Sequence, residues 1–304
     1  MRFIKMLLLS HLICDTSNSA TLTFEKWKSE NTRITIGGLE VSYRVVGKGP
    51  WLTLIHGFPT SSLDWAKILP QLSEHFTVLV FDFIGFGDSS KPKNYNYSTS
   101  ERADLVENLW EALGVDSTSV VAHDFGATVL LELLYRSTNK ALSTKIKSTV
   151  FLNGGLFTDL HKPLIAQKLL MLPYLGAVFN KFITYDMFNK QLRSSLGIQL
   201  EETELEEMWK SIKNRNGLRN YYKLIHYISD RQENRDQWEP LVSADTIPKK
   251  FIWGLKDPIS GAHMIEEVVR RNPKAVVCPI PNVGHFPQLE DPETVAAEIL
   301  NWAI

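Results

Sequence analysis

The segment Val121-Ala122-His123-Asp124-Phe125-Gly126-Ala127 (VAHDFGA) places an acidic residue between two small residues. An apolar run of strand length, Thr118 to Ala122, ends within it, and a helical pattern from Ala127 to Arg136 follows. In a sharp turn from a strand to a helix, small neighbours let the two elements pack closely while the central side chain stays accessible. The spacing therefore predicts a nucleophile elbow centred on Asp124. The alternative is that Asp124 only caps the following helix.

The composition is sufficient for a sizeable buried core and suits a small neutral ligand. The chain has 304 residues, is 44% hydrophobic and carries 33 basic against 34 acidic residues. This balance gives no electrostatic reason to expect nucleic acid as a partner and favours a small apolar substrate, with water as second reactant. The two cysteines, Cys14 and Cys278, show neither metal-ligand spacing nor a disulfide pattern. We expect no metal and no cofactor.

Residues 1–20 have the order of a secretory signal or a membrane-targeting segment. Two basic residues precede an apolar run from Met6 to Cys14, and small and polar residues follow it. The run is too short to span a bilayer with certainty, and Ser10 and His11 interrupt it. The pattern predicts the secretory pathway or an extracytoplasmic location, with membrane association through the N-terminus. A modest N-terminal helix on a cytoplasmic protein is the alternative.

Short apolar runs alternate with helical patterns along the rest of the chain. A β-hairpin is predicted from Thr32 to Tyr43 around Gly37-Gly38. The predicted strands are Trp51–Ile55, Thr77–Phe83, Thr118–Ala122, Ser148–Leu152, Lys250–Trp253 and Ala275–Ile280. The predicted helices are Ser61–Glu74, Ser100–Leu113, Ala127–Arg136, Gly261–Arg271 and Pro292–Trp302. This alternation predicts an α/β fold with a doubly wound, mostly parallel sheet that helices cover on both faces.

One stretch breaks the alternation, because residues 157–236 contain helical patterns only. We therefore expect an α/β core formed by residues 32–156 and 237–304, with 157–236 as an all-helical cap. The cap should lie over the carboxyl edge of the sheet, where open α/β sheets place their sites.

Residues that follow three other predicted strands complete a candidate catalytic site around the elbow. His285 follows the last strand and Asp257 follows the one before, so the chain order is nucleophile, acid, histidine. Asp257 is expected to orient the imidazole of His285. The alternative is that Asp257 is only a turn residue before Pro258, but three members in the right order at three strand ends favour the triad. The backbone N–H groups of Phe58 and Phe125 are expected to converge as an oxyanion hole. His56 and His123 are expected to have structural roles.

An aspartate nucleophile narrows the reaction. Attack on an ester carbonyl would give an anhydride, whereas attack on a saturated carbon gives a stable alkyl ester with the enzyme. His285 would then deprotonate a water molecule that attacks the carboxyl carbon of Asp124. An epoxide oxygen also needs a proton donor, and the candidates in the cap are Tyr174, Tyr185, Tyr221, Tyr222 and Tyr227.

These motifs together resemble the α/β-hydrolase fold family and, within it, the branch of epoxide hydrolases and haloalkane dehalogenases. The matching motifs are HGFPTSS at 56–62, DFIGFGDSSKP at 82–92, HDFG at 123–126, GLKDP at 254–258 and GHFPQLEDP at 284–292. The resemblance implies an α/β-hydrolase with an Asp-His-Asp triad. Further segments, EKWKSE, NGGLF and HYISDRQENRDQW, resemble an animal member of this branch, which implies a membrane-associated hydrolase of the endoplasmic reticulum with an uncertain substrate.

Two positions depart from the branch. Dehalogenases usually have side-chain N–H donors for the halide where this chain has Phe58 and Phe125, and phenylalanine has none. Epoxide hydrolases commonly have phenylalanine at the first position, although usually tryptophan at the second. The sequence therefore favours an epoxide-hydrolase-like enzyme. A haloalkane dehalogenase and a non-catalytic ligand-binding protein are the alternatives, and the oligomeric state stays open.

Overall fold

A computed structural model describes residues 22–172 and 175–303. Within these residues, eight strands form one sheet in the order β1-β2-β4-β3-β5-β6-β7-β8. The strands are β1 (Thr32–Ile36), β2 (Leu39–Val46), β3 (Trp51–Ile55), β4 (Thr77–Phe81), β5 (Ser117–His123), β6 (Lys145–Leu152), β7 (Lys249–Gly254) and β8 (Val276–Ile280). Strand β2 pairs antiparallel with β1 and β4, and the other neighbours pair in parallel. The predicted α/β fold with a mostly parallel sheet is confirmed, whereas the prediction for residues 1–20 lies outside the described residues.

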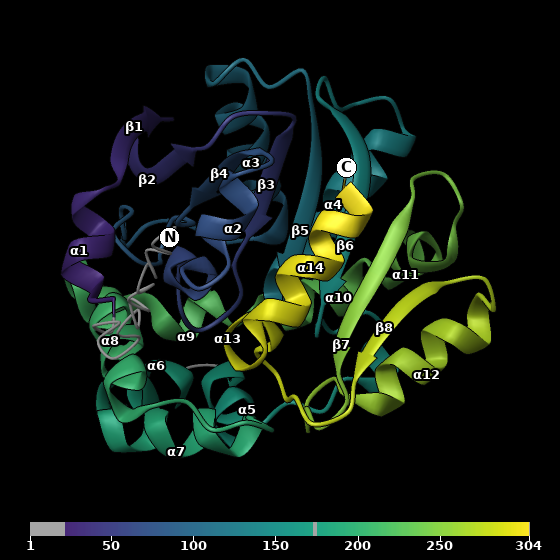
Figure 1. Ribbon diagram of the computed structural model, residues 1–304. Helices are drawn as coiled ribbons and strands as arrows, with labels where there is room; N and C mark the ends of the chain where they lie inside the picture. The colour runs from purple at the N-terminus through teal and green to yellow at the C-terminus, as the bar shows by residue number, and fades with distance from the viewer. Residues whose placement is uncertain (1–21, 173–174, 304) are drawn as a thin grey trace, which may run out of the picture.

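Helices cover both faces of this sheet because its central strands are apolar on both sides. Leu54, Val80, Val121 and Val150 belong to one buried cluster with residues of α2 and α14, which lie in front of the sheet in Figure 1. Ile55, Leu79, Val120 and Phe151 belong to a second cluster with residues of α3 and α4. The helices of the core are α1 (Phe24–Ser29), α2 (Leu69–Ser73), α3 (Thr99–Ala112), α4 (Phe125–Thr138), α12 (Ala262–Arg271), α13 (Pro287–Glu290) and α14 (Pro292–Ala303). Successive strand residues point to opposite faces, so continuous apolar runs supply both clusters.

The predicted helix from Ser61 to Glu74 is wrong. The chain forms a 3-10 turn, η1 (Ser62–Trp65), and then the short helix α2, which begins at Leu69. Pro70 explains the break, because it has no backbone N–H for the hydrogen bond that a continuous helix needs there. At the first turn of α2 that donor is not required, so proline is well placed.

An insertion of helices between β6 and β7 lies at the lower end of the sheet in Figure 1. Its elements are η2 (Thr158–Leu160), α5 (Ile165–Met171), α6 (Leu175–Phe179), η3 (Asn180–Phe182), α7 (Tyr185–Ser195), α8 (Glu202–Lys213), η4 (Asn214–Asn220), α9 (Tyr221–Leu224), α10 (Tyr227–Glu233) and α11 (Arg235–Ser243). The last of these packs on the core, because the indole N–H of Trp238 in α11 donates to Glu132 in α4 over 2.9 Å. Helix α11 therefore extends past the predicted boundary at residue 236.

Polar contacts fasten the inserted helices to the core. The backbone N–H of Phe24 in α1 donates to the carboxylate of Glu207 in α8 over 2.7 Å. On the opposite side, one oxygen of Glu290 accepts the backbone N–H groups of Gly197 and Ile198, both at 2.8 Å. These buried and partly buried contacts hold the insertion against the core. Within residues 22–172 and 175–303, no helix has the length and hydrophobicity that crossing a membrane requires.

The close packing of α4 on β3 depends on Gly126. A Cβ atom at this position would lie 2.7 Å from the backbone oxygens of both Ile55 and His56, closer than van der Waals contact allows. Alanine is about 1 kcal/mol better than glycine inside a helix, but overpacking costs about 1–3 kcal/mol. We expect Gly126→Ala to lower the free energy of unfolding by about 1 kcal/mol or more, measured by urea denaturation. Thr138→Ala at the exposed end of α4 is the control, with a change below about 0.5 kcal/mol. Equal stability of Gly126→Ala and wild type would contradict the contact.

Candidate active site

Asp124 lies at the junction where β5 runs directly into α4. Its backbone has φ 49° and ψ −116°, which is unusual for a residue with a side chain. The backbone N–H of Asp124 donates to Leu152 over 3.1 Å and fixes the turn to β6. Only a small residue fits opposite, because a Cβ on Gly57 would lie 2.7 Å from the Cβ of Asp124. The sharp turn that the VAHDFGA segment predicts is therefore present.

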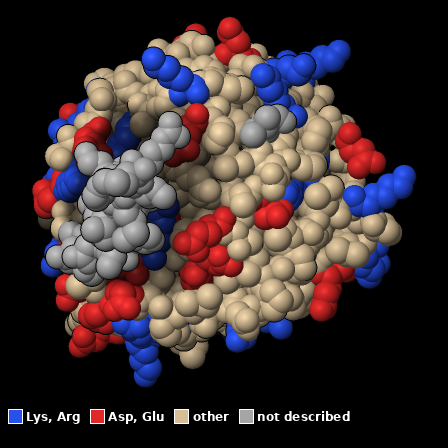
Figure 2. Space-filling view, in the orientation of Figure 1, with Lys and Arg blue, Asp and Glu red and all other residues tan. Residues whose placement is uncertain are grey.

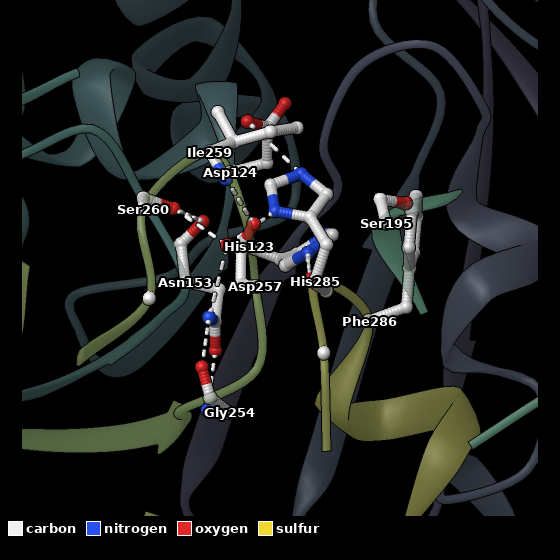
Figure 3. A network of polar contacts seen from close by, with 12 residues as sticks. His123, Asp124, Asn153, Ser195, Gly254, Asp257, Ile259, Ser260, His285 and Phe286 are labelled. Atoms are coloured by element: carbon white, nitrogen blue, oxygen red, sulfur yellow. Dashed lines mark hydrogen bonds and ion pairs between the residues drawn. The ribbon is translucent and has the colours of Figure 1, made fainter. Parts of the chain in front are cut away.

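His285 connects this aspartate to a second one. Its Nε2 atom lies 3.4 Å from Oδ1 of Asp124, and its Nδ1 atom lies 2.7 Å from Oδ2 of Asp257 (Figure 3). All three side chains are buried. They come from the loops that follow β5, β7 and β8, whose carboxyl ends meet at the same edge of the sheet. The structure thus brings together the three residues that the sequence predicted as nucleophile, base and acid.

Four donors hold the carboxylate of Asp257. Besides His285, Oδ2 accepts Asn153 Nδ2 at 3.0 Å and Ser260 Oγ at 2.8 Å, while Oδ1 accepts the backbone N–H of Ile259 at 2.8 Å. A carboxylate with this many donors keeps its orientation and its charge. Sequence reasoning missed Asn153 and Ser260. Asn153 could have been found, because it directly follows a predicted strand, Ser148–Leu152.

The predicted backbone donors lie beside Asp124. The N–H of Phe58 donates to Oδ2 of Asp124 over 2.9 Å. Phe125 is the first residue of α4, and the first N–H groups of a helix have no acceptor within the helix. One of the two predicted oxyanion donors is therefore already engaged with the carboxylate, and the other stands at a helix start next to it.

The two aspartates control the charge of His285. Burial by itself lowers the pKa of His285, but the charge of Asp257 and hydrogen bonds to both carboxylates raise it to about 10. Burial likewise tends to raise the pKa of Asp124, but the hydrogen bond and charge of His285 and the N–H of Phe58 hold it below its ordinary range. At neutral pH the site therefore contains an imidazolium between two carboxylates.

The two neighbouring histidines have structural contacts, as expected. Nε2 of His123 lies 2.7 Å from the backbone oxygen of His285. Nε2 of His56 accepts the backbone N–H of Phe83 at 3.2 Å, and Nδ1 lies 2.9 Å from the backbone oxygen of Gly57. Both side chains are fully buried, and burial lowers the pKa of each to about 4. They are neutral at physiological pH and brace the loops around the site.

Of the five candidate tyrosines, two pack against the phenylalanines that flank Asp124 in the site. The ring of Tyr221 lies 4.9 Å from that of Phe58, and the ring of Tyr227 lies 5.2 Å from that of Phe125. The hydroxyl of Tyr227 is buried and has no hydrogen-bond partner among the described residues. Burial raises the pKa of Tyr227 well above its usual value, and the charge of Asp124 raises it further. Tyr227 therefore carries its proton and has it free to donate.

Two of the other candidates, Tyr185 and Tyr222, make no ring contact with Phe58 or Phe125. Tyr185 donates its hydroxyl to Glu202 and accepts from Asn189 at the surface of the insertion, so its position contradicts the prediction. Tyr222 makes none of the ring contacts with Phe58 or Phe125 that the structure shows for its two neighbours. Tyr174 lies outside the described residues. Helix periodicity in the insertion was too irregular to show which tyrosines face the sheet.

Two small cavities reach the site from the insertion. One of about 30 Å³ is lined by His285, Phe58, Gln191 and Leu192 among others. A neighbouring cavity of about 50 Å³ shares the last three of these residues and adds Tyr221 and the apolar side chains of Phe179, Ile183 and Met187. The approach to His285 is thus narrow and mostly apolar.

Within residues 22–172 and 175–303, no group of three or more His, Cys, Asp or Glu side chains is arranged to hold a metal ion. Figure 2 shows basic and acidic side chains interspersed on one face of the molecule, without a large area of one sign among the described residues.

Comparison with known proteins decides the family. Residues 50–292 match a family model described as alpha/beta hydrolase fold. The chain belongs to this family. This α/β-hydrolase fold protein is 37% identical over 279 residues to the mesoderm-specific transcript homolog protein of Homo sapiens, covering 88% of this chain and 83% of that protein. It is 31% identical over 260 residues to the putative hydrolase LipZ of Mycobacterium tuberculosis, covering 85% and 90%.

Solved structures support the same fold. A haloalkane dehalogenase variant, DbeA-M1 from Bradyrhizobium elkanii, superimposes with a TM-score of 0.76 at 21% identity, over 90% of this chain and 96% of that one. The epoxide hydrolase CorEH superimposes with a TM-score of 0.70 at 23% identity, over 90% and 97%. The resemblance predicted from the sequence motifs is therefore confirmed.

The pKa of His285 makes the stability of this α/β-hydrolase fold protein depend on pH. Because this pKa is raised from 6.5 to about 10, the folded state binds an extra proton between these pH values. The stabilisation is complete below pH 6.5 and is lost as the pH rises through about 10, by at most about 1.4 kcal/mol per pH unit. Urea denaturation between pH 7 and 9.5 should show the decline. Asp124→Asn removes one of the two carboxylates, so its decline should be shallower, and equal slopes would contradict this account.

Proposed function

We propose that this protein is an epoxide-hydrolase-like enzyme that uses Asp124 as nucleophile and forms an alkyl-enzyme ester. One observation supports this above the others. Groups suited to each step lie around Asp124. Its carboxylate has the N–H of Phe58 at 2.9 Å and Nε2 of His285 at 3.4 Å. From the insertion, Tyr227 brings an unpartnered hydroxyl on a ring that lies 5.2 Å from the ring of the adjacent Phe125.

In the first step, Oδ1 of Asp124 attacks a carbon of the epoxide and the carbon–oxygen bond of the ring breaks. Asp124 needs no base for this step, because its lowered pKa keeps it ionised. The epoxide oxygen leaves as an alkoxide and takes the proton of Tyr227. Oδ2 remains on the N–H of Phe58 as the carbonyl oxygen of the new ester.

In the second step, the loss of the negative charge on Asp124 changes the protonation state of His285. An ester no longer favours the imidazolium, so the pKa of His285 falls and its proton can return to the phenolate of Tyr227. Neutral His285 then takes a proton from water while the hydroxide attacks the carboxyl carbon of Asp124. The N–H groups of Phe58 and Phe125 stabilise the oxyanion. Collapse breaks the bond between the carboxyl carbon and Oδ1, and the departing alkoxide takes the proton of the hydroxyl that came from water. The diol thus carries Oδ1 of Asp124 as its new oxygen, while Asp124 is again a carboxylate and His285 is again protonated.

The rings of Phe58 and Phe125 favour an epoxide over a haloalkane. A departing halide needs side-chain N–H donors, and neither residue has one. The ring of Phe125 instead stacks on Phe86 at 5.7 Å and lies under the guanidinium of Arg102 at 4.3 Å. A departing epoxide oxygen needs one proton, which Tyr227 supplies. The narrow apolar approach supports a substrate that is small and apolar near its reacting carbon.

The His285→Gln variant should trap the ester, because it retains the nucleophile and lacks the base that activates water. After incubation with styrene oxide, we expect intact-protein mass spectrometry to show a gain equal to the whole epoxide, with the label on Asp124. A bromoalkane would instead add only its alkyl group, which would favour the dehalogenase alternative. The double variant with Asp124→Asn is the control and should remain unlabelled. The absence of any adduct would favour a ligand-binding protein without catalysis.

Tyr227→Phe tests the proton donor. Removing a general acid typically lowers a rate by about 10²–10⁴-fold, so we expect kcat for epoxide opening to fall by about 100-fold or more, with little change in KM. Tyr185→Phe removes the same hydroxyl from a surface tyrosine and should leave kcat within about twofold. Equal activity of both variants would exclude Tyr227 as the donor.

A further inference from the structure

Helix α10 presents a buried arginine one turn after Tyr227. Arg231 is 2% exposed, and its guanidinium carbon lies 5.5 Å from the ring of Tyr227. Its only hydrogen bond in the described chain is donated to the backbone oxygen of Gly155, and its Nε atom is buried without a partner. Among the described residues no carboxylate lies within ion-pairing distance of Arg231. A buried guanidinium in this state is costly, because one carbonyl does not neutralise its charge.

The nearest acidic groups already have partners. Asp124 and Glu239 both act on Arg231 through their charge. Asp124 is engaged by His285 and Phe58. Glu239 accepts the backbone N–H and hydroxyl of Thr158, each at 2.8 Å, and pairs with Arg271 at 3.3 Å. Neither is available to compensate the charge of Arg231.

His161 lies beside the arginine. A Cβ placed on Gly155 would contact both NH1 of Arg231 and Nδ1 of His161, so the two side chains meet at the same glycine. Both ring nitrogens of His161 are buried and unpartnered among the described residues. Burial and the charge of Arg231 lower the pKa of His161 to about 3, which leaves a neutral ring that can donate one hydrogen bond.

These two side chains line a cavity of about 350 Å³. Its other lining residues include the apolar Met171 and Ile228, and at its rim the exposed Gln232 and Glu233. At roughly 30 Å³ for one water-sized group, it can hold on the order of ten non-hydrogen atoms. The cavity therefore combines the buried Arg231 and the hydrogen-bonding His161 with two apolar side chains, and it opens to solvent beside polar residues.

We propose that this cavity binds the carboxylate of the substrate, on Arg231 and His161. An arginine fork matches a carboxylate in shape, and an anion would compensate the charge that the protein leaves unpaired. This rests on the proposed function for the reacting end, and it refines the substrate class to apolar epoxides that carry a carboxylate. Arg231 and Tyr227 lie four residues apart on α10, so one helix would position both the acid group and the epoxide oxygen.

Binding of unreactive ligands tests this without catalysis. The test compares the affinities of octanoate and 1-octanol for the wild-type protein by isothermal titration calorimetry. Octanoate should bind at least tenfold more tightly than 1-octanol. Arg231→Met should weaken octanoate binding at least tenfold and change 1-octanol binding less than twofold. Arg235→Met is the matched control, because it removes the same charge from an exposed arginine that pairs with Asp159.

A second variant guards against misfolding of Arg231→Met. His161→Phe leaves the buried charge in place and should weaken octanoate binding about three- to tenfold, with 1-octanol unchanged. Equal binding of the two ligands to wild type would overturn the proposal. So would a preference for octanoate over 1-octanol that is as large in Arg231→Met or His161→Phe as in wild type. Neither ligand carries an epoxide, so a failure here is distinct from a failure to trap the ester in His285→Gln.

Discussion

His285 lies between two buried carboxylates, and the attraction of one imidazolium for both of them organises the site. Its positive charge offsets part of the desolvation cost of each buried, ionised aspartate, in addition to the backbone and side-chain donors that hold them. The same attraction joins the loops after β5, β7 and β8. Asn153, after β6, adds a fourth loop by donating to Asp257 and accepting the backbone N–H of Gly254.

Two buried guanidinium groups add to the charges in the interior of the molecule. Arg102 and Arg231 are both buried, and neither has a carboxylate within ion-pairing distance among the described residues. The charge of Asp124 acts on Arg231, whereas the guanidinium of Arg102 lies 4.3 Å from the ring of Phe125. Asp64 adds no charge at neutral pH, because burial raises its pKa to about 8. With Asp124 ionised, His285 protonated and the guanidinium of Arg231 without an ion-pair partner, this part of the interior is suited to anionic ligands.

Most of the fold could be predicted from local patterns. Each predicted strand corresponds to an observed strand, because continuous apolar runs are buried on both faces in a parallel sheet and stand out from amphipathic helices. The predicted helix from Ser61 to Glu74 failed where Pro70 interrupts it. The insertion was identified only as helical, since its end in α11 depends on packing against α4, a contact that periodicity cannot show.

The sequence by itself determined the members of the predicted triad and their order, because in parallel sheets the residues after the strands converge at one edge. It also determined that a carboxylate stands at the centre of the sharp turn after β5, and the proposed alkyl-ester chemistry rests on this feature. Only the tertiary structure decided which tyrosine packs on Phe125, that Asn153 and Ser260 hold Asp257, and that Arg231 and His161 meet at Gly155. These contacts join residues far apart in the chain through the angles at which helices cross the strand ends, and no local pattern encodes those angles.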